Sequence, residues 1–309
     1  MTSTPLIPST TATTLTATTP TATTPTATTP TAAAATATRS TSAPAGSGAT
    51  GSDHADTALA TVRAWDNPPQ VAARGTVIVV AGRGEHPGVY ERFGTRIAAD
   101  GYRVRAVGDP TRDDNAAITV AADVSSLLAD PDLPAPRVLA GSDAGAAFVA
   151  ALAATGQVQV DALLLVGLPT ATDEHGQQDE PAGAGEQDWT AELAARTACP
   201  THQARLDADP GVRRGALERP VPAAWLTDGD LAAVSAPILG LHGTADLVSP
   251  LRQARARYAS APRAELVTID GGRHDALNDA THRSAAAAIV LFLERLRLGA
   301  DLPTIARWV

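Results

Sequence analysis

Short aliphatic runs alternate with amphipathic stretches along most of the 309 residues of this chain. Residues 75–81 form a β-branched run bounded by glycine, which is typical of a strand buried on both faces of a parallel sheet. A helical pattern follows over 90–100, and residues 102–107 predict the next strand. The alternation continues with a predicted helix at 121–129, a strand at 137–140 and a helix at 144–154. This order predicts an α/β fold with a mostly parallel, doubly wound sheet.

The alternation is interrupted once, between two predicted strands. Residues 162–167 have the pattern of a buried strand, but the segment from about 169 to 236 is polar, glycine-rich in part and weakly helical only at 190–196. The order strand, helix, strand, helix then resumes at 237–242, from about 251, at 264–269 and at 283–298. Because open α/β sheets keep their sites at the carboxyl ends of the strands, we expect the segment 169–236 to form a lid over that edge.

The first 56 residues have a different composition from the rest of the chain. Thr, Ala and Pro dominate them, and the pentad Thr-Ala-Thr-Thr-Pro recurs from Thr16 to Pro30. Such a segment buries too little apolar surface to offset its conformational entropy, so we expect a disordered tail over 1–56 and one α/β domain over 57–309. The tail lacks the basic start and apolar run of a secretory signal, and later runs are too short for a membrane span. These features predict a cytoplasmic protein.

Composition narrows the possible partners. The formal charge is −9 and every basic residue is Arg, with no Lys, so nucleic acid is not an expected partner. Cys199, the one cysteine, has no disulfide partner within the chain. Cys199 and His202 have the spacing of half a metal site, but without further ligands nearby we expect them to pack structurally, as we do His86 and His242. We therefore expect neither a metal nor an organic cofactor, and a small molecule as substrate.

The segment Arg137-Val-Leu-Ala-Gly-Ser-Asp-Ala-Gly-Ala146 predicts a nucleophile elbow. A nucleophile on a sharp turn between strand and helix needs small residues on both sides, in the pattern G-x-Nu-x-G. Gly141 and Gly145 bracket Asp143, which places a carboxylate where most such enzymes have serine. The alternative register makes Ser142 the nucleophile. The strand count and the position of Gly145 favour Asp143.

Two further motifs follow the elbow in the order acid, then histidine. Asp246 lies in the loop after the predicted strand 237–242, and His274 lies in a Gly-Gly-Arg-His loop after the strand 264–269. The order nucleophile, acid, histidine is that of α/β-hydrolases. The imidazole would activate water or a hydroxyl, and the carboxylate would hold its tautomer and stabilise the imidazolium.

The sequence also resembles a family. Ala81-Gly-Arg-Gly-Glu-His-Pro-Gly-Val-Tyr90 is similar to the H-G-x-G-E-H-S-x-x-Y segment of lysophospholipases and monoacylglycerol lipases, which are serine aminopeptidase-like α/β-hydrolases. His274-Asp-Ala-Leu-Asn278 resembles their H-E-x-x-N stretch. The resemblance, over about 75–296 apart from the lid, implies an α/β-hydrolase fold, Asp246 as acid and His274 as base. It also implies an oxyanion hole of backbone N–H groups from Arg83 and Ala144. Two departures are Ala81 in place of a histidine and Asp143 in place of the serine.

An aspartate at the elbow resembles epoxide hydrolases and haloalkane or haloacetate dehalogenases. By that resemblance Asp143 would attack a saturated carbon of a small or medium-sized apolar substrate, and His274 would activate the water that hydrolyses the resulting ester. Opening an epoxide needs an acid, usually a lid tyrosine, and none of the tyrosines lies in the predicted lid; these are Tyr90, Tyr102 and Tyr258. A halide needs N–H donors, for which the candidates are Trp189 and Trp225. The alternatives are a serine esterase using Ser142 and a hydrolase fold that binds without turnover.

Overall fold

The computed structural model describes residues 62–170 and 189–307. The predicted tail and residues 171–188 of the predicted lid lie outside the described residues. Within them the chain builds a seven-stranded sheet in the order β1-β3-β2-β4-β5-β6-β7. Its strands are β1 (Val62–Trp65), β2 (Thr76–Val80), β3 (Arg103–Val107), β4 (Arg137–Ser142), β5 (Ala162–Val166), β6 (Ile238–Gly243) and β7 (Ala264–Ile269). Only β1, which pairs with β3, runs antiparallel among these strands.

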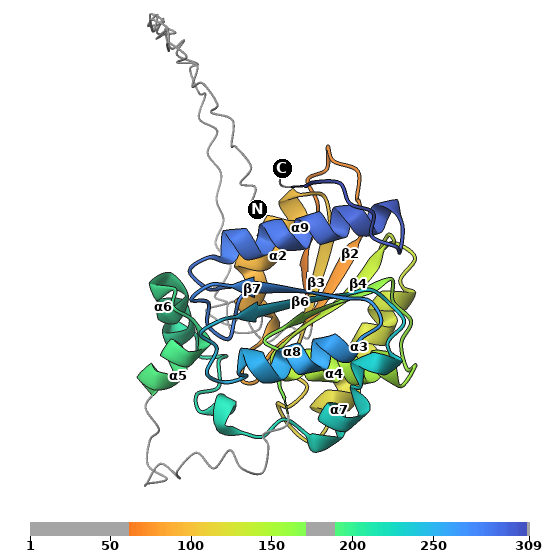
Figure 1. Cartoon of the computed structure of the whole chain (residues 1–309). Coiled ribbons are helices and arrows are strands. Elements are labelled where there is room, and N and C mark those ends of the chain that lie inside the picture. The colour runs from red at the N-terminus through yellow and green to blue at the C-terminus, as the bar shows by residue number, and fades with distance from the viewer. Residues whose placement is uncertain (1–61, 171–188, 308–309) are drawn as a thin grey trace, which may run out of the picture. The chain divides into compact units, whose positions relative to one another are not determined.

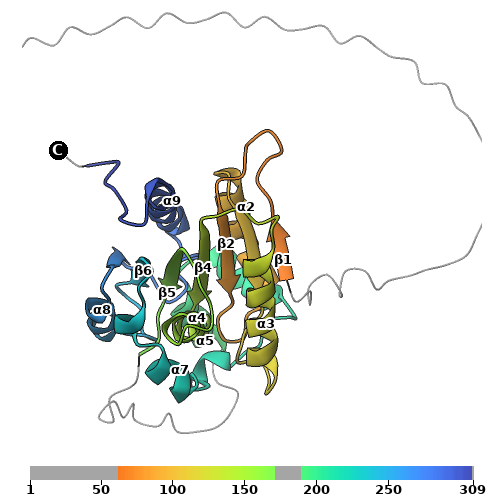
Figure 2. The same cartoon turned by 90° about the vertical axis from the view of Figure 1, so that its right-hand side faces the viewer.

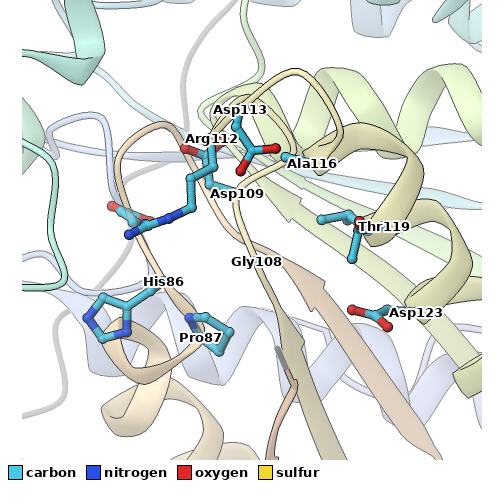
Figure 3. A pocket seen from close by; sticks show the side chains of 11 residues that line it. His86, Pro87, Gly108, Asp109, Arg112, Asp113, Ala116, Thr119 and Asp123 are labelled. Carbon is cyan, nitrogen blue, oxygen red and sulfur yellow. The ribbon is translucent and has the colours of Figure 1, made fainter. Parts of the chain in front are cut away.

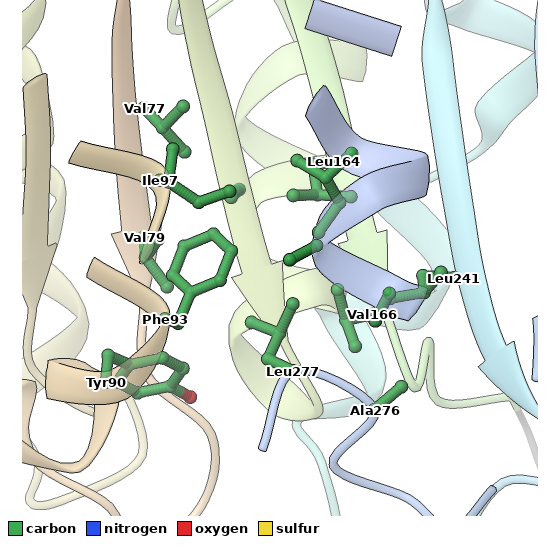
Figure 4. Packing of buried hydrophobic residues seen from close by; sticks show 14 of the residues in the cluster. Val77, Val79, Tyr90, Phe93, Ile97, Leu164, Val166, Leu241, Ala276 and Leu277 are labelled. Atoms are coloured by element: carbon green, nitrogen blue, oxygen red, sulfur yellow. The ribbon is translucent and has the colours of Figure 1, made fainter. Parts of the chain in front are cut away.

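Helices cover both faces of the sheet, as the pattern predicted (Figures 1 and 2). One face packs against α2 (Glu91–Ala99) and α9 (His282–Leu298), and the other against α3 (Ala116–Ala129), α4 (Ala144–Ala154) and α8 (Leu251–Ser260). Alternate strand residues divide between two apolar clusters because successive side chains of a strand point to opposite faces. Figure 4 shows the cluster between the sheet and the helices α2 and α9, where Phe93 and Ile97 of α2 meet Val77 and Val79 of β2.

The central strands are buried along their full length. Every residue of β2, β4 after Arg137, β5 and β6 is buried, as expected for parallel strands covered on both faces. Helix α4 lies beneath them and consists mainly of alanine, and its residues from 144 to 152 are all buried. The small side chains let the helix approach the sheet closely directly after the elbow.

The predicted fold class is confirmed, and the differences from the predicted elements are local. Helix α3 begins at Ala116, five residues before the predicted start at 121, because its β-branched first turn weakens the helical pattern. Strand β1 was not predicted. Its four residues form only an edge strand, too short for a clear alternation.

The inserted segment is helical where it is described. It contains α5 (Trp189–Arg196), α6 (Pro200–Ala208) and α7 (Ala223–Asp228), with short 3-10 turns η2 (Ala216–Glu218) and η3 (Leu231–Ala233). Only α5 matches a helical pattern in the prediction. Helices α5 and α6 lie beyond one end of the strands, whereas α7 packs near α4 (Figure 1). Among the described residues, no helix combines the length and the apolar character that a membrane crossing needs.

Candidate functional site

Asp143 occupies a sharp turn between β4 and α4. Its backbone has φ 51° and ψ −126°, a conformation that an L-residue adopts only under strain. The chain can make this turn because a Cβ on Gly141 would lie 2.3 Å from the carbonyl oxygen of Gly145, and one on Gly145 would lie 2.4 Å from that of Val80. Both glycines of the predicted motif are therefore required by close backbone approach. The geometry is that of a nucleophile elbow with Asp143 at its tip.

His274 contacts both of the other residues that the sequence singled out, Asp143 and Asp246. Its Nδ1 lies 2.8 Å from Oδ2 of Asp246, and its Nε2 lies 3.0 Å from Oδ1 of Asp143. Asp246 follows β6 and His274 follows β7, so the carboxyl ends of parallel strands bring them together. Gly167, after β5, leaves room for the histidine, because a Cβ there would lie 2.7 Å from the carbonyl oxygen of His274 and 3.1 Å from its ring.

The two carboxylates determine the charge of the imidazole. Burial alone would lower the pKa of His274, but the charges of Asp246 and Asp143 and their hydrogen bonds to the ring raise it to about 10. Burial would raise the pKa of Asp246, yet His274 and two backbone N–H groups hold it below its usual value. The resting site thus holds an imidazolium between two carboxylates.

Arg83 contacts Asp143 through its side chain as well as its backbone. Its backbone N–H donates to Oδ2 of Asp143 at 2.9 Å, its Nε to the same oxygen at 2.8 Å, and its Nη2 to Oδ1 at 2.7 Å. Burial would raise the pKa of Asp143, but the charge of Arg83 and the bonds from His274 hold it well below its usual range. Both side chains are almost fully buried, at 7% and 3% exposure. The sequence indicated Arg83 only for its backbone N–H, because no local pattern reports where its guanidinium points.

Residues of the inserted segment contact the Arg83 loop. Arg196, at the end of α5 and 2% exposed, donates from Nη2 to the carbonyl oxygen of Arg83 at 2.8 Å and pairs with Glu85 at 3.3 Å. Glu85 in turn accepts from the hydroxyl of Tyr90 at 2.5 Å. The carbonyl oxygens of Ala195 and Arg196 accept from the backbone N–H groups of His274 and Asp275. The end of α5 therefore contacts both loops of the site, one through the Arg196 guanidinium and the other through backbone carbonyls, and sequence reasoning missed Arg196.

The remaining candidates lie in different surroundings. Ser142 is the last residue of β4 and is buried, and the ring nitrogens of His274 contact Asp143 and Asp246 instead of it. Ala144 begins α4 directly after the elbow. His86 bonds to Asp209 at 2.8 Å, and His242 bonds to the carbonyl oxygen of Ser249 at 2.6 Å and lies 3.3 Å from Oδ2 of Asp246.

The tryptophans and the cysteine are occupied elsewhere. Trp189 donates its indole N–H to Asp207 at 2.8 Å, and Trp225 packs edge-on against Phe148 of α4. The indole N–H of Trp189 therefore already has a partner in this structure, and the suggestion that these two indoles hold a halide stays a prediction. Cys199 is buried beside Arg92, whose Nη1 lies 3.5 Å from the sulfur. Among the described residues, no group of three or more His, Cys, Asp or Glu side chains is arranged to hold a metal.

A cavity of about 180 Å³ lies beside the Arg83 loop. Figure 3 shows it between His86 and Pro87 on one side and Thr119 and Asp123 on the other, with Arg112 at the top of the view. Its described walls include Glu85 and Asp109 but not Asp143, Asp246 or His274. The three site residues are themselves 2–5% exposed, so the site is closed in this structure.

Comparison with known proteins gives similarity in structure but not in sequence. No family model matches the chain, and no curated protein matches it in sequence. A soluble variant of monoglyceride lipase from Saccharomyces cerevisiae is 14% identical, with a TM-score of 0.62 over 76% of this chain and 91% of that one. The monoacylglycerol lipase of Paleococcus ferrophilus is 18% identical, with a TM-score of 0.57 over 77% and 98%.

A thermostable carboxyl esterase from Bacillus coagulans, in complex with glycerol, is 19% identical, with a TM-score of 0.55 over 76% and 94%. The two lipases bear the name of the group that the 81–90 and 274–278 motifs resemble. The likeness extends over nearly the whole length of each of the three and over about three quarters of this chain. The chain therefore has the α/β-hydrolase fold.

Proposed function

We propose that the chain is a hydrolase that forms a covalent ester on Asp143. The observation that carries this proposal is the position of His274, which bonds to Asp246 through one nitrogen and to the elbow carboxylate through the other. A protein that uses the fold only to bind has no need of this geometry. The strained backbone of Asp143 supports the same conclusion, since strain is retained where the surrounding structure holds a functional group in place.

The first step is attack by a carboxylate oxygen of Asp143 on a saturated carbon of a small or medium-sized substrate. The carbon–oxygen bond forms as the bond to the leaving group breaks, and the leaving group takes the electron pair. This step needs no base, because the pKa of Asp143 is held well below its usual range and the group is ionised at neutral pH. The protonated His274 is therefore no obstacle to it.

The second step is hydrolysis of the ester by water. Esterification neutralises Asp143 and so removes one of the two charges that raise the pKa of His274. His274 can then lose its proton to solvent and act as base toward a water molecule, with Asp246 holding its tautomer. Water attacks the ester carbonyl carbon, the backbone N–H groups of Arg83 and Ala144 stabilise the oxyanion, and the released alkoxide takes the proton from His274.

The alternative with Ser142 as nucleophile has less support in the geometry. Ser142 is the last residue of a regular strand, and the ring nitrogens of His274 contact other groups. A non-catalytic binding function has one observation in its favour, because Arg83 covers both oxygens of Asp143. Each of these two alternatives predicts an outcome different from that of the aspartyl mechanism in the experiment described next.

The test is intact-protein mass spectrometry of the His274→Ala variant after incubation with a panel of haloalkanes, epoxides and p-nitrophenyl esters. A haloalkane or epoxide that the wild type hydrolyses should leave one adduct on this variant, in the peptide that contains Asp143, with the mass of the alkyl group of the halide or of the whole epoxide. In a serine triad the histidine is needed for the first attack, so its loss suppresses both steps. An inactive His274→Ala protein without adduct, on a halide or epoxide that the wild type hydrolyses, would therefore contradict the aspartyl mechanism.

Matched elbow variants give the control. Asp143→Asn should abolish turnover and adduct formation, whereas Ser142→Ala should retain most of the activity. Labelling of the wild type by a fluorophosphonate, lost in Ser142→Ala, would identify a serine esterase instead. Absence of turnover across the whole panel by a correctly folded wild type would favour the binding function.

A further inference from the structure

Arg83 is the group at this site that the proposed reaction does not explain. Its backbone N–H serves the oxyanion hole, but its guanidinium contacts both oxygens of Asp143, the group that has to attack. The opposite edge is fixed by the lid, because Nη1 donates to the carbonyl oxygens of Leu217 at 2.8 Å and Arg219 at 2.5 Å. The guanidinium is thus held in one orientation over the nucleophile.

Arg83 loses its ion-pair partner during the proposed reaction. In the resting site its 7%-exposed side chain is balanced by Asp143. Once Asp143 is an ester, the guanidinium keeps carbonyl oxygens as hydrogen-bond partners, and Asp246 is bound to His274. The carboxylates of Asp109 and Glu192 still act on it through their charges, but among the described residues only Asp143 forms an ion pair with it. A buried cation without an anion in direct contact is unfavourable. A neutral substrate would leave it in that state.

A substrate carboxylate would resolve both difficulties. The forked N–H groups of a guanidinium match the two oxygens of a carboxylate, so a substrate anion can take the bonds that Asp143 gives up. That exchange frees an oxygen of Asp143 for attack and keeps Arg83 neutralised in the ester. We propose that the substrate is a small carboxylate and that Arg83, oriented by the carbonyls of Leu217 and Arg219, binds its anionic group. The inference rests on the proposed function and adds a charged end to the apolar substrate expected from the sequence.

The balanced reaction for a 2-halocarboxylate illustrates the proposal. An Asp143 oxygen bonds to the carbon that bears the halogen, and the halide leaves with the bonding pair while the carboxylate stays on Arg83. Water then adds to the ester carbonyl and the alkyl oxygen leaves as the hydroxyl of a 2-hydroxycarboxylate. The sum is one halide and one proton released per water consumed.

The first experiment measures binding without chemistry. In Asp143→Asn the neutral amide keeps the shape of the side chain but leaves Arg83 without its anion. Propionate should then raise the Tm of this variant by several degrees in a concentration-dependent manner, and propionamide or an equal ionic strength of chloride should not. The double variant Arg83→Gln, Asp143→Asn should show no response to propionate. A propionate effect that persists without Arg83, or none in Asp143→Asn, would overturn the proposal.

If Asp143→Asn does not fold, the wild type takes its place with Arg83→Gln as control. The expected propionate effect is then smaller, because Asp143 competes for the guanidinium, and its absence would overturn the proposal equally.

The second experiment measures turnover of an isosteric pair. Halide release from 2-bromopropionate should exceed that from 2-bromopropionamide by about 100-fold or more in kcat/KM, a ratio that should collapse in Arg83→Gln. Equal turnover of the two compounds would overturn the inference and leave the proposed function standing. Arg83-dependent binding of propionate without turnover of either compound would instead contradict the proposed chemistry and support carboxylate recognition alone.

Discussion

The imidazolium between two carboxylates predicts an unusual dependence of stability on pH. The pKa of His274 is raised from 6.5 to about 10 in the folded protein. When folding raises the pKa of a histidine, the stabilisation is fully present at any pH below the pKa of the unfolded state. It is lost as the pH rises from that value to the pKa of the folded state. The slope in this window is about 1.4 kcal/mol per unit of pH, or about 5 kcal/mol over its full width. Between pH 7 and pH 9 the free energy of unfolding should therefore fall by roughly 2–3 kcal/mol.

Few other groups titrate in that window. The chain has no lysine. Burial raises the pKa of each tyrosine above its usual value, so these phenols stay protonated below pH 10. Burial would raise the pKa of Cys199, but the hydrogen bond from Arg92 lowers it, which gives an effect of opposite sign. A Cys199→Ser background removes that contribution and leaves His274 as the dominant group.

Urea unfolding followed by circular dichroism between pH 7 and pH 9 measures the effect directly. In the Cys199→Ser background the midpoint should fall steadily with pH, and His274→Gln should remove the slope. His282→Gln, which alters a partly buried histidine outside the site, should keep it. Histidine ring NMR of the folded protein gives a second readout, since one imidazolium should persist beyond pH 9. A stability that is flat over this range, or equally sloped in His274→Gln, would refute the charge assignment.

Two further predictions concern the elbow and the lid. Gly145→Ala places a Cβ about 2.4 Å from the carbonyl oxygen of Val80, so it should lower the free energy of unfolding by about 3 kcal/mol or more. The control is Gly108→Ala, because a Cβ at Gly108 has no heavy atom within 4 Å. It should change the free energy of unfolding by less than about 1 kcal/mol in the same urea titration. Arg196→Met leaves buried Glu85 without its cation and should cost about 3–5 kcal/mol. Arg214→Met, whose side chain is 59% exposed, should change the urea midpoint little, and equal losses in the two arginine variants would contradict the buried-pair argument.

The sequence predicted what depends on periodicity and on short motifs. Helix α4 begins and ends at the predicted residues because Gly141, Gly145 and the alanine run leave few alternatives. Strand β7 also has the predicted bounds, 264–269. The structure brings Asp143, Asp246 and His274 together because each follows a parallel strand, and only β5 lies between β4 and the adjacent pair β6 and β7.

The missed features depend on contacts between distant parts of the chain. Helix α6 has no clear apolar stripe, although Pro200 directly after Cys199 is a common first residue of a helix and could have indicated it. The side chains of Arg83 and Arg196 point into the site because of partners 60 and 111 residues away in the chain. A local pattern carries no information on such pairs, since an arginine between glycines or at a helix end is equally compatible with solvent.

The ties from Arg196 have a consequence for engineering. Its guanidinium holds the carbonyl of Arg83, and the carbonyls at the end of α5 hold the backbone of the His274 loop. A lid transplanted from another α/β-hydrolase would remove these anchors together with the old specificity. Residues 217–219, by contrast, meet the site through the backbone carbonyls of Leu217 and Arg219, and their side chains are exposed or only partly buried. A library that varies those three side chains alone can therefore explore new substrates while the loops of the site keep their scaffold.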